Sequence, residues 1–137
     1  VQVFTAPCTL FVPFVEEGWI SADDDVVLGM VSRYLEPLKQ SGVDTLILGC
    51  THYPLLRHMV GEIMGEKVTL VNPAYETALE LKALLEKEGI ANDGENKNFE
   101  NPYEFFVSDA ADKFKNFANS ILPCDVTSIK QINIEEY

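Results

Sequence analysis

The chain has 137 residues, enough for one modest domain with a hydrophobic core of its own. Apolar residues make up 47% and charged residues 23%, the proportions of an ordinary soluble globular protein. Ten basic and 22 acidic side chains give a net charge of −12, which argues against a surface for nucleic acid or for an anionic membrane. No apolar run approaches the roughly 20 residues that cross a bilayer, and the chain shows no basic leader of a signal peptide.

Three cysteines are spread widely along the chain, at Cys8, Cys50 and Cys124. An odd number at such spacing is a poor framework for disulfides and fits a reducing compartment. We therefore expect a cytoplasmic protein with free thiols. The first residue is Val rather than Met, so a fragment of a longer protein is one interpretation of the chain.

The first third of the sequence predicts a strand, a loop and a helix. Residues 1–4 have the pattern of a short buried strand, and residues 10–19 that of an apolar loop. Ser21 is expected to cap the helix that follows, because acidic residues fill its first turn. Apolar residues then recur at helical spacing over residues 27–38, and the pair 41–42, Ser-Gly, ends the helix.

The rest of the chain alternates between strands and helices. Strands are expected at residues 45–48, 68–71, 105–107 and 126–134, and helices at about 54–64, 74–87 and 110–122. The run 45–48 is continuous and apolar, as in a central strand of a parallel sheet. The polar stretch 91–102 is expected to be a surface loop or linker. This alternation predicts an α/β fold with a mostly parallel sheet and flanking helices.

We expect the chemistry at the end of the strand 45–48. In open α/β sheets, ligands bind beyond the carboxyl ends of the strands, and this strand leads directly into Gly49 and Cys50. A helix starting there would offer unpaired N–H groups and the positive end of its dipole. Both stabilise a thiolate and can hold a substrate carboxylate. Thr51 can cap this helix, and His52 can shuttle a proton or polarise the thiol.

Other interpretations of Cys50 differ in the spacing that they require. A cysteine at a strand end is often a small packed residue of the core. Six residues separate Cys50 from Arg57, one more than a tyrosine-phosphatase-like loop needs, and the sequence has no redox Cys-x-x-Cys pair. Cys50 and His52 alone are too few and too close for a zinc site. We therefore expect no metal at this turn.

The run 45–56, Thr-Leu-Ile-Leu-Gly-Cys-Thr-His-Tyr-Pro-Leu-Leu, resembles the second catalytic motif of the glutamate racemases. Residues 10–18 resemble the loop that precedes this motif in the same family, and residues 105–109 resemble the family's last β–α unit. The resemblance covers essentially the whole chain. It implies a cofactor-independent isomerase that interconverts L- and D-glutamate for peptidoglycan synthesis, and so for cell-wall biogenesis and cell shape.

The same resemblance implies roles for individual residues. In that family two cysteines face each other across the substrate Cα, and one removes the proton while the other donates from the opposite face. Cys50 would be the acid/base of the second lobe, Thr51 would help to bind the substrate, and His52 would assist Cys50 and contact the substrate. Glu16 matches a glutamate near the family's site. Glu17 is the alternative, and either can be a solvated loop carboxylate.

Part of the family pattern does not occur in this chain. The family's other catalytic cysteine, in an Asn-Thr context, and its early Asp-Ser motif are both missing. Cys8 is interpreted as a packed residue, and Cys124 matches no catalytic position. The resemblance therefore implies the C-terminal half of a two-lobe aspartate/glutamate racemase-like fold. Residues 1–72 would be the later part of the second lobe, and residues 73–137 would return to complete the first.

Half of such a site should have no racemase activity by itself. Its expected partners are glutamate, the missing N-terminal half and, through uncovered sheet edges, further copies of the chain. Two alternatives stay open. A racemase of the same superfamily that acts on aspartate or hydantoins could share the Gly-Cys-Thr chemistry. The chain could also be a non-catalytic binding or interaction module.

Overall fold

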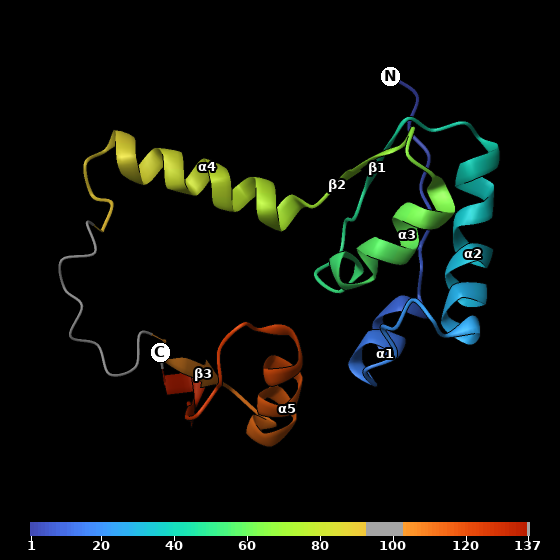
Figure 1. The fold of residues 1–137 in the computed structure, drawn as a ribbon. Coiled ribbons are helices and arrows are strands. Elements are labelled where there is room, and N and C mark those ends of the chain that lie inside the picture. The colour runs from blue at the N-terminus through green and yellow to red at the C-terminus, as the bar shows by residue number, and fades with distance from the viewer. Residues whose placement is uncertain (93–102, 137) are drawn as a thin grey trace. The chain divides into compact units, whose positions relative to one another are not determined.

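A computed structural model describes residues 1–92 and 103–136 of the protein (Figure 1). The chain forms two compact units, Val1–Ala91 and Asn92–Tyr137, and each is described here by itself. Most of the linker predicted at residues 91–102 lies outside the described residues. The assignment of residues 1–72 and 73–137 to two different lobes stays a prediction.

The first unit joins helices to a short parallel pair of strands. Its elements are α1 (Phe11–Glu16), α2 (Asp25–Gln40), β1 (Thr45–Ile47), the 3-10 helix η1 (Tyr53–Leu56), α3 (Arg57–Met64), β2 (Thr69–Val71) and α4 (Pro73–Lys87). Strands β1 and β2 run parallel, with Thr45 beside Thr69 and Ile47 beside Val71. The predicted alternation of strands and helices is therefore confirmed here, and the fold is α/β.

The second unit repeats the arrangement on a smaller scale. It contains β3 (Phe105–Val107), α5 (Ala111–Ile121), β4 (Ile129–Gln131) and the 3-10 helix η2 (Ile134–Glu136), and β3 pairs with β4 in parallel. The strand predicted at residues 126–134 is present only in its middle. Val126 is buried, and its N–H donates to Asn119 Oδ1 at 2.7 Å. The start of the predicted strand is therefore bound to a side chain of the preceding helix.

The core of the first unit lies where α2 packs against α3. On α2 the buried residues are Val27, Val31, Leu35 and Leu38, and on η1 and α3 they are Leu56, Met59, Val60 and Met64. In the first set the residues recur every three or four positions, and the second set follows the same period with Met59 and Val60 side by side, so each set lies on one helix face. Because a two-stranded sheet is at best marginally stable alone, the strands depend on this helix packing.

Two predictions about strands are wrong in an informative way. Residues 1–4 form no strand, and Val1, Val3 and Phe4 are exposed. Strand β1, predicted to be central, pairs with β2 alone among the described strands and leaves Ile47 63% exposed. Both differences have one cause, the lack of a neighbouring strand. Without one, residues 1–4 have no partner for their backbone hydrogen bonds, and β1 stays at an edge of the sheet.

Residues 10–19, predicted to be a loop, contain helix α1. Phe11 and Val15 lie one turn apart and are both buried. Their burial stabilises the helix, and a prediction from the local sequence does not include it. Pro13 is tolerated because it stands in the first turn, where its missing N–H breaks no helical hydrogen bond. The helix ends before Gly18, whose φ of 79° suits glycine.

Asp24, rather than the predicted Ser21, caps helix α2. The Asp24 carboxylate accepts hydrogen bonds from the N–H groups of Val26, at 2.8 Å, and Val27, at 3.3 Å. The Ser21 hydroxyl oxygen accepts a hydrogen bond from the Asp23 N–H and closes a separate turn. The acidic cluster therefore supplies the cap itself, in addition to a favourable charge at the helix start.

Helix α4 carries apolar side chains but no buried residue. It begins at the Asn72 cap, whose side-chain oxygen accepts from the Ala74 N–H at 3.1 Å. Leu79, Leu81 and Leu84 are all exposed along it. Neither α4 nor any other helix among the described residues is both long and apolar enough to cross a membrane.

The helix core gives a first prediction. Replacing the fully buried Leu56 by Ala should lower the free energy of unfolding by about 2–5 kcal/mol, because methyl groups leave a close-packed site that cannot fully collapse. Leu79→Ala, on the exposed surface of α4, is the matched control and should change it by less than about 0.5 kcal/mol. Urea unfolding followed by circular dichroism measures both. Equal losses in the two variants would contradict this description of the core.

Candidate active site

The turn after β1 holds the residues predicted to carry chemistry. The Leu48 N–H donates to the Val71 carbonyl at 2.9 Å, beyond which the chain leaves the sheet. The Gly49 N–H then donates to the Ile47 carbonyl at 3.0 Å, and the Cys50 N–H to the Leu48 carbonyl at 2.9 Å. Two tight backbone hydrogen bonds therefore define the turn. Cys50 is a free, partly exposed thiol at the carboxyl end of β1.

The helix that follows Cys50 begins differently from the prediction. Its first turn is the 3-10 helix η1, with Pro54 in a position that needs no N–H donor. His52 precedes η1, and no side chain caps it. Thr51, the predicted cap, places its hydroxyl oxygen 3.2 Å from His52 Nδ1 instead. The side chain of Thr51 therefore interacts with the imidazole and not with the helix backbone.

Glu16 and His52 come together although they are far apart in the sequence. Glu16 is the last residue of α1, and its Oε1 lies 3.7 Å from His52 Nε2. This distance is too long for a good hydrogen bond but short enough for an ion pair when the imidazole is protonated. The Glu16 side chain is 42% exposed and that of His52 24%. Glu17, the alternative, follows α1 as an exposed residue.

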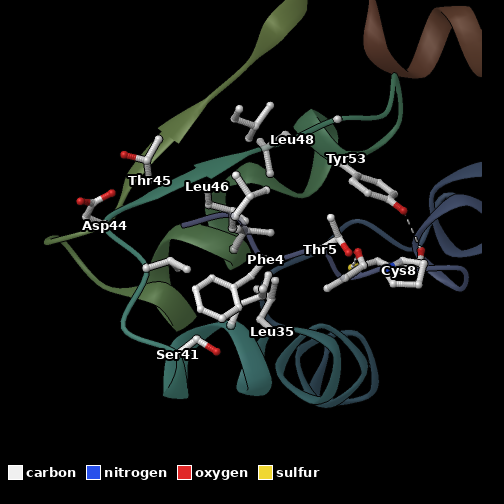
Figure 2. A pocket seen from close by; sticks show the side chains of 18 of the residues that line it. Phe4, Thr5, Cys8, Leu35, Ser41, Asp44, Thr45, Leu46, Leu48 and Tyr53 are labelled. Atoms are coloured by element: carbon white, nitrogen blue, oxygen red, sulfur yellow. Dashed lines mark hydrogen bonds between the residues drawn. The ribbon is translucent and has the colours of Figure 1, made fainter. Parts of the chain in front are cut away.

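Tyr53 anchors the turn to the N-terminal segment. Its hydroxyl donates to the Cys8 carbonyl at 3.2 Å (Figure 2). Its ring packs edge-on against Phe11, with the ring centroids 5.1 Å apart, and Phe11 packs in the same way on Tyr34 at 5.5 Å. The sequence analysis assigned no role to Tyr53. Its partners lie in another element, and the only signal in the sequence was an aromatic residue inside the turn.

Burial changes the acidity of two groups beside this turn. It raises the pKa of the Tyr53 phenol above its ordinary value. The neighbouring Cys8, Cys50 and Tyr34 act in the same direction, while hydrogen bonding with the Cys8 backbone has a smaller, opposite effect. Burial also raises the pKa of the Cys8 thiol, which is 4% exposed and donates to the Ala6 carbonyl at 3.5 Å. Cys8 is thus a packed residue, as predicted.

The arrangement offers acid/base chemistry at the end of β1. A thiol in the turn and a carboxylate–imidazole pair at the start of η1 can together accept, hold and return a proton. Within the described ranges, no group of three or more His, Cys, Asp or Glu side chains is close enough together to hold a metal ion. Cys124, the third thiol, belongs to the second unit and is partly exposed.

The raised pKa of Tyr53 predicts a dependence of stability on pH. The folded chain holds the phenol proton more tightly than the unfolded chain does. This contribution is therefore complete below the ordinary tyrosine pKa of about 10 and is lost as pH rises through the higher folded value. Tyr53→Phe should cost about 1 kcal/mol at pH 7, the net value of one hydrogen bond, and should lose stability less steeply at alkaline pH.

Denaturant unfolding of both proteins at several pH values between neutral and strongly alkaline measures this difference. Parallel pH profiles for the two proteins would show that Tyr53 keeps an ordinary pKa in the folded chain.

Comparison with known proteins gives a consistent set of relatives, although no family model matches the chain. A glutamate racemase from Geobacter metallireducens is 40% identical over 136 residues, which are 98% of this chain and 48% of that protein. A glutamate racemase from Neisseria meningitidis is 40% identical over 133 residues, 96% of this chain and 47% of that protein. The chain thus spans about half the length of the curated relatives that it matches.

Solved structures agree with the sequence relatives. The glutamate racemase of Francisella tularensis, crystallised in complex with D-glutamate, matches 100% of this chain and 49% of its own, with a TM-score of 0.83 and 28% identity. A glutamate racemase isoform of Bacillus anthracis matches 98% of this chain and 48% of its own, with a TM-score of 0.82 and 33% identity. The chain is therefore similar along its whole length to glutamate racemases and spans about half the length of each.

Proposed function

We propose that this chain is the C-terminal half of a glutamate racemase, in which Cys50 is one of two acid/base groups. The observation that carries the proposal is the approach of Glu16 to His52 beside the Cys50 turn. Two segments distant in the sequence meet at the carboxyl end of a parallel strand, where α/β proteins bind their ligands. Similarity to glutamate racemases along the whole of this chain supports the same function.

Racemisation needs an acid and a base on opposite faces of the substrate Cα. In one direction the Cys50 thiolate takes the Cα proton and leaves a carbanion, while an acid on the other face returns a proton. In the opposite direction Cys50 donates its thiol proton and becomes a thiolate. The Cα–H is a very weak acid, so the closed site must stabilise the carbanion with fixed dipoles and exclude water.

His52 and Glu16 act as a pair beside the Cys50 turn. The Glu16 carboxylate lies 3.7 Å from His52 Nε2 and helps to hold the imidazole in place. In that position the imidazole can pass a proton within the site. Thr51, against the opposite ring nitrogen, limits rotation of the imidazole. Thr51 and His52 then also bind the substrate, in the roles that the family resemblance implies.

The second acid/base group is proposed to come from the part of a racemase that this chain does not match. The Cys8 thiol is buried in the protein and therefore cannot act as the second acid/base group. The chain alone is therefore expected to be inactive. In the whole protein residues 1–72 would complete one lobe and residues 73–137 the other. That protein would act in the cytoplasm and supply D-glutamate for peptidoglycan, and the oligomeric state of this chain stays a prediction.

Activity on aspartate or hydantoins remains the alternative within the superfamily, and a non-catalytic binding module the alternative outside it. The names of the relatives favour glutamate over the other racemase substrates. The free thiol and the Glu16–His52 pair favour a catalyst over a binding module. Both alternatives are distinguished by the same experiment.

A chimeric racemase tests the proposed function. The 137 residues would replace the aligned stretch of the Geobacter metallireducens protein, and circular dichroism would follow the interconversion of L- and D-glutamate. The chimera should be active on glutamate and inactive on aspartate and on a hydantoin. Cys50→Ala should lower its kcat by about 10²–10⁴-fold, the usual effect of losing an acid/base group.

Cys124→Ala is the matched control, because it removes a partly exposed thiol from the other unit. It should leave the activity unchanged. A chimera that unfolds cooperatively on heating yet shows no activity would refute the proposed function. So would a Cys50→Ala variant as active as its parent.

The two neighbouring glutamates give a separate prediction. Glu16→Gln removes the charge that faces His52 and should lower kcat of the chimera by about tenfold, equivalent to roughly 1.4 kcal/mol. Glu17→Gln makes the same change one residue away and should leave kcat unchanged. Equal effects of the two variants would remove Glu16 from the site.

A further inference from the structure

A cavity in the first unit lies beside β1, on the edge away from β2. It has a volume of about 1050 Å³. Residues 1–8 line one side and residues 44–49 the other, while Leu35 and Leu38 of α2 and Val60 of α3 lie between them. Figure 2 shows Phe4, Leu35 and Leu46 around this space. Among its lining residues, all in the described part of the chain, Asp44 alone has a charged side chain.

The backbone of β1 has hydrogen-bonding groups on this side that another strand could use. The Asp44 carbonyl and the Leu48 N–H both bind β2, at 2.8 and 2.9 Å. In a parallel ladder alternate residues point to opposite edges, so the N–H groups of Thr45 and Ile47 and the Thr45 carbonyl face the cavity. The Ile47 carbonyl already accepts from the Gly49 N–H. Among the described residues no other strand pairs with that edge. Both residues are also exposed, which is unusual in a parallel sheet.

Residues 1–4, on the other side of the cavity, also lack a partner strand. Residues 1–4, Val-Gln-Val-Phe, have the composition of a strand but form none. Figure 1 shows the N-terminal segment as a nearly straight trace that leads to α1. A strand-like segment without a neighbour and a sheet edge without a neighbour thus face each other across one apolar cavity. A single strand between them would complete both.

The size of the cavity agrees with one strand. A strand residue occupies about 160 Å³, given a rise of about 3.3 Å, a strand spacing of about 4.8 Å and a layer of about 10 Å. The cavity therefore has room for roughly six residues, close to the usual length of a strand. A small polar substrate would leave most of this apolar surface uncovered.

We propose that this cavity is the place of one β-strand, supplied by the part of a glutamate racemase that these 137 residues do not match. The strand joins residues 1–4 to β1 and makes β1 central, as its apolar sequence requires. The proposal rests on the proposed function for the source of the strand. The half-length match to every relative described above supports that source, because half of such a protein lies outside this chain.

Amide hydrogen exchange in the 137-residue chain tests the proposal. The probe is the part of the Geobacter metallireducens glutamate racemase outside the match, expressed together with this chain and purified as a complex. The amides of Thr45 and Ile47 should exchange at least about tenfold more slowly in the complex, because only bonded edge amides are protected. The Leu48 amide, already bonded to β2, is the internal control and should change little.

Two variants separate the cavity from other contact surfaces. Thr45→Pro removes an edge donor and should abolish the protection of Ile47, since proline is tolerated at the start of an unpaired edge but cannot bond a new strand. Val3→Glu places a charge in the cavity and should weaken the complex by at least about tenfold. Val26→Glu makes the same change at an exposed residue outside the cavity and should have no effect.

Several results would overturn the proposal. One is a complex in which Thr45 and Ile47 stay unprotected, because the halves would then meet elsewhere. Another is the absence of any complex. A third is slower exchange of the same amides in this chain alone as its concentration rises. The cavity would then be filled by a second copy of the chain. A protected but inactive complex would leave the strand in place and count against the racemase function alone.

Discussion

The hydrogen bond from the Tyr53 phenol to the Cys8 carbonyl joins the two segments from which the candidate site is built. Phe11 reinforces it, because its ring packs on Tyr53 while its own helix runs on to Glu16. Burial raises the pKa of Tyr53, so the phenol remains a donor well into the alkaline range. With this contact in place, the end of α1 lies beside the turn that contains His52, and Glu16 can reach the imidazole.

The same contact closes one end of the apolar cavity, since Cys8 and Tyr53 both line it. Strand β1 therefore links the two features. Its free edge borders the cavity, and its carboxyl end leads into Cys50. A strand bonded along that edge would restrain β1 from both sides. Because an acid/base group must be held within a fraction of an ångström of its working position, we expect such a strand also to steady the turn that carries Cys50.

Local patterns in the sequence were sufficient for most helices. The spacing of Val27, Val31 and Leu35 predicted α2, and the helix predicted at about residues 74–87 is α4. Helix α1 was missed because its short apolar run with Pro13 looks like a loop until Phe11 and Val15 find partners. The strand at residues 1–4 was overpredicted, since β structure depends on a neighbour that local sequence does not reveal.

By itself the sequence determined the order of strands and helices from α2 onward, the turn that presents Cys50 and the family that it resembles. These features depend on hydrogen bonds and side-chain spacing within a few residues, so they are written locally in the chain. Only the tertiary structure decided that Glu16 rather than Glu17 faces His52, that Tyr53 holds the turn, and that β1 has an open edge. Each of these depends on which distant segments pack together, and the spacing of residues along the chain does not reveal that packing.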